Sequence, residues 1–155
     1  MLPTGSPNER LLRRLENAWG QLTDSYQGLS EPDLTQPGAA GSWSVKDVVA
    51  HVTTWEEEAL KHLPTIMRGG RPPRYASEGG IDAFNARAAD SKLGLSLEAV
   101  FEQRDDTHRR LLEFVRTAPA DQVVSPRFVK RLRLDSYGHY KLHAQAIRSW
   151  RAHNL

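Results

Sequence analysis

The segment from Ser136 to Trp150, SYGHYKLHAQAIRSW, repeats its apolar and histidine positions at the spacing of an α-helix. At about 100° per residue, two histidines four positions apart fall on the apolar face of this helix. That face consists of His139, Leu142, His143, Ala146, Ile147 and Trp150. Burying two imidazoles costs free energy unless their nitrogens find partners, and a divalent cation is one such partner. The pair therefore predicts either a metal site or two structural core histidines.

Three further stretches show the same helical periodicity, and all of them are amphipathic. They cover residues 8–28, 45–69 and 97–118, and a shorter helix is expected at 81–91. Ser44 and Asp47 have the spacing of a capping box at the start of the second helix. The chain is therefore expected to be helical almost throughout.

The connections complete the expected architecture. Residues 119–133 are interpreted as a linker in which 128–134 could be extended, and Asp135 or Ser136 is expected to cap the last helix. No segment offers a convincing strand. We therefore expect an all-α fold in which residues 1–155 form one domain, a four-helix bundle with long connections and one short extra helix.

Composition limits the function classes. Cysteine is absent, so disulfides and thiolate metal sites are excluded and a metal would need His, Asp or Glu ligands. The net charge is only +2, with both signs mixed along the helices, so we expect no nucleic-acid partner. Residues 1–14 lack the apolar core of a signal peptide, and no apolar run reaches the ~18–20 residues of a membrane span. We therefore expect a cytoplasmic protein without a membrane partner.

The second helix offers a third histidine for the site. His51 lies at the edge of its apolar arc, and Glu58 follows seven residues later on the same side. One histidine from one helix and two from another are a common set of three metal ligands. Such a set leaves a fourth position for water or substrate, as in catalytic metal sites.

The remaining histidines are weaker candidates for metal ligands. His108 falls centrally on the stripe of the third helix, where it could be an alternative ligand, support a ligand, or bond a backbone carbonyl within the core; the last is expected. His62 and His153 lie nearer helix ends and are expected to face solvent. Trp55 and Tyr140 are candidates for pocket walls, and equally for ordinary core.

Two segments together resemble the DinB/YfiT-like superfamily of four-helix bundle metalloenzymes, most closely its ClbS/DfsB-type branch. The first is WSVKDVVAHVTTWEEEAL, residues 43–60, and the second is DSYGHYKLHAQAIRSW, residues 135–150. The shared signature is the Trp-Ser-x-Lys-Asp helix start with a histidine four residues past the Asp, followed much later by the paired histidines. The resemblance covers roughly residues 8–151.

This resemblance implies a metal held by His51, His139 and His143. Zinc or nickel is the expected ion, and three imidazoles with an open position also suit iron, manganese or cobalt. Some members of the superfamily, including ones in the ClbS/DfsB branch, act without a metal. Members of the superfamily also often form dimers, so a homodimer is a further expectation.

The resemblance also implies a class of activity. Relatives include thiol-dependent S-transferases and a hydrolase-like self-resistance branch. We therefore expect a metal-dependent hydrolase or S-transferase of detoxification type that acts on a small electrophilic molecule, with a low-molecular-weight thiol as a candidate partner. Glu58 is the candidate general base. The alternative is a metal-free protein that binds or sequesters a small toxic molecule.

Overall fold

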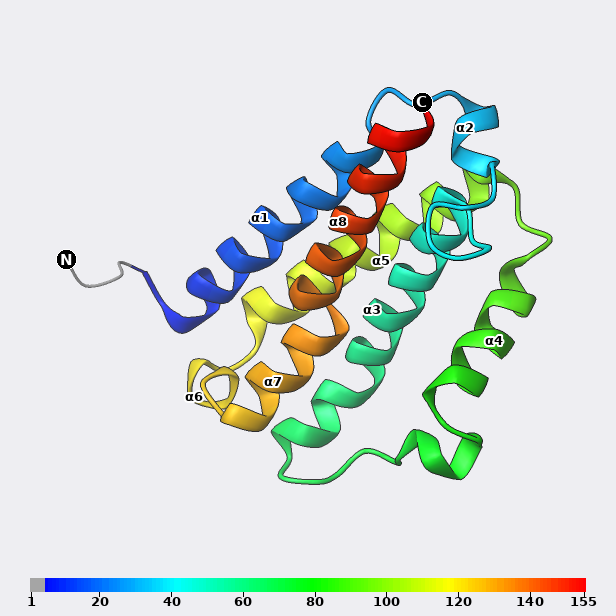
Figure 1. Ribbon diagram of the computed structural model, residues 1–155. Coiled ribbons are helices and arrows are strands. Elements are labelled where there is room, and N and C mark those ends of the chain that lie inside the picture. The colour runs from blue at the N-terminus through cyan, green and yellow to red at the C-terminus, as the bar shows by residue number, and fades with distance from the viewer. Residues whose placement is uncertain (1–4) are drawn as a thin grey trace.

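The structure is a computed structural model that describes residues 5–155. Residues 1–4, which belong to the expected domain 1–155 and to the segment 1–14, lie outside this range. Helices make up most of the described chain (Figure 1). They are α1 Pro7–Tyr26, α2 Glu31–Thr35, α3 Val45–Met67, the 3-10 helix η1 Tyr75–Glu78, α4 Ile81–Lys92, α5 Leu97–Thr117, α6 Ala120–Val123, α7 Pro126–Asp135 and α8 Tyr137–Asn154. Between residues 5 and 155 the only β-type pairing is an isolated bridge between Ala40 and Trp43.

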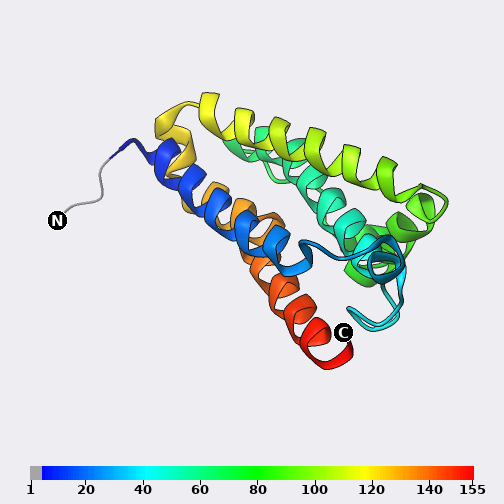
Figure 2. The same cartoon turned by 90° about the horizontal axis from the view of Figure 1, so that it is seen from above.

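Four helical rods form the bundle, as the sequence predicted. Seen from above, α1, α3 and α5 each form one rod, and α7 and α8 follow one another as the fourth (Figure 2). The main packing pairs are α1 with α8 and α3 with α5, while α7 packs on α3. Apolar side chains from all four rods share one buried core, including Leu15, Leu63, Leu111 and Ile147. Within residues 5–155 no helix is long and apolar enough to cross a membrane.

The capping box that the sequence predicts fixes where α3 begins. The backbone N–H of Asp47 donates to the Ser44 hydroxyl over 3.1 Å, and the backbone N–H of Ser44 donates to the Asp47 carboxylate over 3.0 Å. Each bond satisfies a backbone donor at the helix start that lacks a partner within the helix. The box sets the register of α3, and with it the face on which His51 lies.

The expected linker over residues 119–133 is wrong, because this stretch contains α6 and most of α7. Pro126 lies in the first turn of α7. Backbone N–H groups in a first turn have no acceptor within the helix, so a proline there removes no helical hydrogen bond. Phe128 and Leu132, one helical turn apart, are fully buried in the core. The apolar spacing in this stretch is therefore helical, and the extended interpretation of 128–134 does not hold.

A break at Ser136 separates α7 from α8. Ser136 leaves helical geometry with φ −136° and ψ −100°, and its hydroxyl donates to the carbonyl of Leu132. Gly138 follows at a tight contact, because a Cβ there would lie 2.9 Å from the carbonyl oxygen of Arg133. The break changes the direction of the chain just before His139.

The buried face of α8 differs from the predicted one. Its buried residues are Tyr137, Tyr140, Ala144, Ile147 and Trp150, whereas Leu142 is 65% exposed. His139 and His143 are therefore half-buried at the edge of this face rather than at its centre. A position at the edge lets both imidazoles reach the neighbouring α3 while the tyrosine ring between them fills the core.

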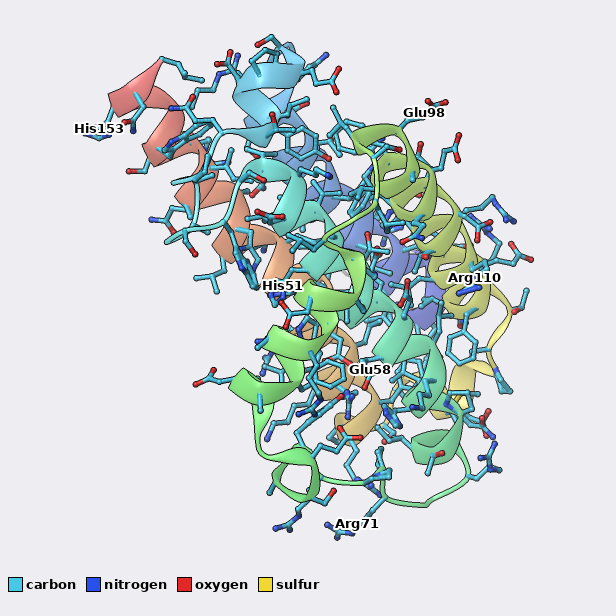
Figure 3. The ribbon with its side chains drawn as sticks, turned by 90° about the vertical axis from the view of Figure 1, so that its right-hand side faces the viewer. His51, Glu58, Arg71, Glu98, Arg110 and His153 are labelled. Atoms are coloured by element: carbon cyan, nitrogen blue, oxygen red, sulfur yellow. The ribbon has the colours of Figure 1, made fainter. Side chains whose placement is uncertain are left out.

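Helix α4 and the short helix η1 lie outside the bundle and cover α3 (Figure 3). No residue of α4 is buried, which is the property of a helix that lies over a surface rather than within a core. One of its anchors is a hydrogen bond of 2.9 Å from the indole N–H of Trp55 to the side-chain oxygen of Asn85. The space between this cover and the bundle holds the candidate site.

Candidate metal centre

Three imidazoles from two helices converge at the candidate site. His51 comes from α3, and His139 and His143 lie one turn apart on α8. The Nε2 atom of His139 lies 2.9 Å from Nε2 of His51 and 2.9 Å from Nε2 of His143. One nitrogen from each ring lies within 4.8 Å of the others, a spacing that could hold a metal ion. The structure thus brings together the three residues that the sequence analysis selected.

Hydrogen bonding alone does not account for this cluster. A neutral imidazole nitrogen either carries one hydrogen or offers one lone pair. Nε2 of His139 therefore cannot form hydrogen bonds to both neighbouring Nε2 atoms, although both lie at hydrogen-bond distance. A cation between the rings would accept all three lone pairs at once. The donor set fits a divalent ion that prefers nitrogen ligands, including zinc and nickel.

The electrostatics of the cluster favour the neutral imidazoles that bind metals. Burial lowers the pKa of His51 to about 4, with a smaller contribution from the neighbouring His143. Burial, and then the other two rings, lower the pKa of His139 to about 2. Burial also lowers the pKa of His143. All three rings are therefore neutral at pH 7, the form in which imidazole ligates a cation.

Nδ1 of His139 is a second unusual feature, since it is buried without a hydrogen-bond partner in the described structure. Metal-ligating histidines commonly donate their other ring N–H to a carboxylate, a carbonyl or a water. A buried water is one group that would satisfy this nitrogen.

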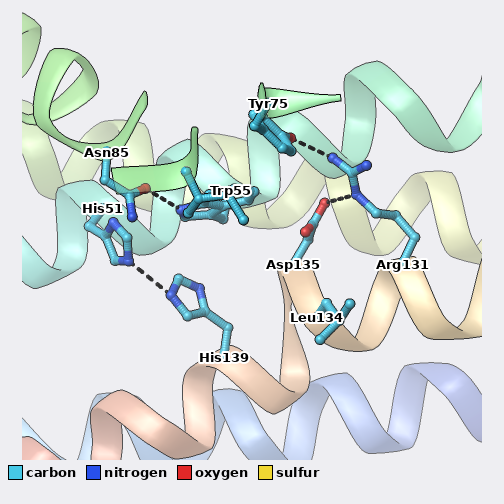
Figure 4. A pocket seen from close by; sticks show the side chains of 9 residues that line it. His51, Trp55, Tyr75, Asn85, Arg131, Leu134, Asp135 and His139 are labelled. Atoms are coloured by element: carbon cyan, nitrogen blue, oxygen red, sulfur yellow. Dashed lines mark hydrogen bonds and ion pairs between the residues drawn. The ribbon is translucent and has the colours of Figure 1, made fainter. Parts of the chain in front are cut away.

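A cavity of about 330 Å³ opens beside two of the three histidines. His51 and His139 form one end, Trp55 forms a wall, and Arg131 and Asp135 lie at the other end (Figure 4). Apolar groups supply most of its surface, including Ile81 from α4 and Leu134 from α7. The cavity therefore suits a small molecule with an apolar body.

A chain of hydrogen bonds holds the polar end of the cavity. The guanidinium of Arg131 donates to Asp135 and to the Tyr75 hydroxyl, both over 2.6 Å. The Tyr75 hydroxyl in turn donates to Glu58 over 3.0 Å. Burial raises the pKa of Asp135 to about 6, against the opposing effect of Arg131. Burial likewise raises the pKa of Tyr75.

The structure places Glu58 in this chain and away from the imidazole cluster. Its partners are the Tyr75 hydroxyl and His62, whose Nε2 lies 3.4 Å from the Glu58 carboxylate. No hydrogen bond or ion pair within residues 5–155 joins it to the three histidines. The expectation that His62 faces solvent is wrong, because it is buried against Glu58. His153 is exposed, as expected.

His108 belongs to a separate buried network. Its Nδ1 lies 2.6 Å from the Glu56 carboxylate, which also accepts a bond of 2.5 Å from the Tyr140 hydroxyl. Trp19 stacks on the His108 ring with centroids 3.6 Å apart. The expected backbone-carbonyl partner is therefore wrong, since the partner is a fully buried carboxylate. Tyr140 lies in this core network rather than in a pocket wall, whereas Trp55 does line the cavity.

Four polar residues of the cavity were missed from the sequence. Tyr75 and Asn85 lie in segments with no buried residue, where helical periodicity carries no information. Arg131 and Asp135 lie in the stretch interpreted as a linker and cap. Their i, i+4 spacing would have been informative had that stretch been assigned as a helix.

The class of protein follows from comparison with known families. The sequence profile of the DinB superfamily matches residues 14–145. The chain therefore belongs to the DinB superfamily, as its sequence resemblance indicated. No curated protein matches it.

Solved structures share the whole fold at low identity. DfsB, described as a sibling lethal factor precursor, has a TM-score of 0.77 and 14% identity over 97% of this chain and 98% of its own. The colibactin self-resistance protein ClbS, solved with double-stranded DNA, has a TM-score of 0.77 and 12% identity over the same shares. A protein from Streptococcus pneumoniae has a TM-score of 0.78 and 13% identity, with 100% and 96% covered. At these identities the likeness establishes the fold alone.

The expectation that excludes nucleic acid as a partner is wrong. A protein of the same fold, ClbS, has been solved in complex with double-stranded DNA. The expectation depended on a net charge of +2 and on charges that are mixed along the sequence. Such a balance does not report how charges gather on a folded surface, because residues far apart in the sequence become neighbours.

Proposed function

We propose that this protein is a divalent-metal-dependent hydrolase or S-transferase that acts on a small electrophilic molecule. Its metal ligands are Nε2 atoms of His51, His139 and His143. The observation that carries the proposal is the double contact of the His139 Nε2 atom, which two hydrogen bonds cannot explain. Zinc or nickel suits three neutral imidazoles best, and iron, manganese or cobalt would also fit.

In this proposal the cavity beside the histidines binds the substrate. When bound, a divalent cation supplies Lewis acidity, which polarises an electrophile and lowers the pKa of a water or low-molecular-weight thiol nucleophile. The apolar wall around Trp55 and Leu134 binds the body of the substrate and excludes water. His51 and His139 lie at the end of this cavity, so the wall holds the substrate against the ligand histidines.

The polar end positions the substrate and holds protons. Asp135, with its raised pKa of about 6, exchanges a proton near neutral pH and is the cavity's own acid or base. Glu58 accepts the Tyr75 hydroxyl hydrogen and keeps that hydroxyl aimed between the carboxylate and Arg131. Glu58 is therefore a positioning residue in this proposal, instead of the general base that the sequence suggested.

A second candidate function needs no metal. The cavity itself favours it, because about 330 Å³ with mainly apolar walls can bind a small molecule without any cation. The self-resistance protein ClbS shares the fold. In this case the protein sequesters a toxic molecule, and the imidazoles act as hydrogen-bonding groups.

Metal analysis separates the two candidates. Purified, untagged protein is analysed for metals before and after chelation, and the chelated protein is titrated with zinc and nickel. The metal-dependent proposal expects near-stoichiometric binding that is lost in His139→Ala and His143→Ala and kept in the control His153→Ala, which changes an exposed histidine. Failure of the wild-type protein to bind either ion would overturn this proposal and favour the metal-free candidate.

A further inference from the structure

Two adjoining hollows lie between α1 and the segment α6–α7–α8, while α4 lies across the bundle from α1 (Figure 1). Their volumes are about 200 Å³ and about 440 Å³. Arg14 and Val129 line both hollows, so the two form one continuous depression, which we call the α1 groove. None of its lining residues belongs to the cavity beside the histidines.

The α1 groove is lined by cations and, among the residues described, by no acid. Its cations are Arg10, Arg14, Arg133 and Lys141. Within residues 5–155 no hydrogen bond or ion pair joins Arg14, Arg133 or Lys141 to another side chain, and Arg10 donates to the backbone carbonyl of Gly5 over 2.7 Å. With no carboxylate to neutralise them, these four charges add up to a local positive potential.

The exposed arginines of α5 differ from these cations, because carboxylates lie beside them. On α5, Arg109 lies 2.6 Å from Asp106, Arg110 lies 3.9 Å from the same carboxylate, and Arg116 lies 2.7 Å from Glu113. These pairs largely cancel their own charges. The α1 groove therefore gathers four cations with no carboxylate in its described lining, which the net charge of +2 does not reveal.

The cations follow a line instead of converging on a point. Arg10, Arg14, Asn17 and Gln21 follow one another along one face of α1, and at 1.5 Å per residue they extend over about 16 Å. Arg133 and Lys141 face them from α7 and α8. A single phosphate would contact one or two of these groups. An extended chain of phosphates can contact all four, and the two amides can donate to its oxygens.

The groove also lacks a platform for bases. Its aromatic residue is Tyr137, which is only 6% exposed and so offers no face for stacking. Proteins that bind single strands commonly stack bases on exposed aromatic rings. The polar groups of the groove are cations and amides, which are suited to contact the phosphates of a duplex. Such phosphate contacts do not depend on the base sequence.

We propose that the α1 groove binds the phosphodiester backbone of duplex nucleic acid, independently of base sequence. The inference goes beyond the proposed enzyme activity and does not depend on the metal centre. Four phosphate contacts predict that affinity falls with salt at a logarithmic slope of about −3.6. Between about 50 mM and about 200 mM salt, this slope corresponds to a loss of about 150-fold.

Fluorescence anisotropy with a labelled DNA duplex of about 20 base pairs tests the proposal. Arg14→Glu/Arg133→Glu is expected to weaken binding at least ~10-fold at about 50 mM salt and to reduce the slope by about 2. Arg109→Glu/Arg110→Glu on α5 is the matched control, because it changes the net charge equally. Its affinity is expected to stay within about threefold of the wild type. Arg14→Gln/Arg133→Gln repeats the test without charge reversal.

Three results would overturn the proposal. The first is an absence of binding by the wild-type protein at about 50 mM salt. The second is an equal loss of affinity in the groove variant and the α5 control, which would indicate attraction by net charge alone. The third is competition by inorganic pyrophosphate as effective as that by unlabelled duplex at equal phosphate concentration, which would indicate a site for a small phosphate compound.

Discussion

The Nε2 atoms of His51 and His139 lie 2.9 Å apart, although 88 residues separate them in the sequence. Two features of the chain produce this contact. The capping box at Ser44 sets the register of α3, and the break at Ser136 sets the direction of α8. The candidate site therefore depends on how two helices begin as much as on the histidines themselves.

Gly138→Ala is expected to destabilise the protein. The added methyl group would lie 2.9 Å from the carbonyl oxygen of Arg133, and backbone there has little freedom to yield. We predict a loss of about 1–3 kcal/mol in the free energy of unfolding, measured by urea denaturation. Gly20→Ala is the control, since nothing lies within 4 Å of that position and the helix interior favours alanine by about 0.5–1 kcal/mol. A stability of Gly138→Ala equal to that of the wild type would contradict the close contact.

Glu56→Ala is expected to be among the most damaging single changes in the core. It removes the carboxylate shared by His108 and Tyr140 and leaves these two buried groups only their long contact of 3.5 Å with each other. We predict a loss of about 3–5 kcal/mol in unfolding free energy. Glu57→Ala serves as the neighbouring control and should lose less than about 1 kcal/mol, because its pair with Lys92 is partly exposed. Similar losses in the two variants would argue against the buried network.

Acid should destabilise the metal-free protein through the imidazole cluster. The pKa of His51 is lowered from 6.5 to about 4 in the folded state, so the unfolded chain binds the extra proton first. Its contribution to stability is present above pH 6.5 and is lost as the pH falls towards 4. Between pH 7 and pH 5 the titration of His51 alone lowers the free energy of unfolding by about 2 kcal/mol.

Comparison of variants isolates this effect from other titrating groups. Asp135 acts in the opposite direction, since its raised pKa favours the folded state as the pH falls from about 6 towards 4. In chelator, His51→Gln should reduce the loss of stability between pH 7 and pH 5 by about 2 kcal/mol. His153→Gln, at an exposed position, should leave the wild-type pH dependence unchanged. An unchanged pH dependence in His51→Gln would refute the lowered pKa of this ring.

Helical periodicity predicted the bundle and made the three histidines candidates, and the resemblance to the superfamily implied that they form one set. The amphipathic stripes of α1, α3 and α5 are long, and each is bounded by recognisable caps or breakers. The spacing of His139 and His143 placed both rings on one side of a helix whatever their depth of burial. These features are local, so the sequence reports them directly.

The features of the fold and the site that the sequence did not predict depend on contacts between distant segments. Helix α7 was missed because residues 119–133 were interpreted as a linker, although Pro126 occupies a helix start, where proline is tolerated. The burial of His62 and the carboxylate partner of His108 depend on side chains from neighbouring segments. The α1 groove collects cations from three helices, and no window of the sequence places them together.

X-ray absorption at the zinc edge of the zinc-loaded protein tests the metal centre most directly. We predict a first shell that contains three imidazole nitrogens at about 2.0–2.1 Å, reduced to two imidazoles or lost altogether in His139→Ala. A first shell of oxygen alone, or an identical imidazole count in His139→Ala, would contradict the assignment of His51, His139 and His143 as the ligands.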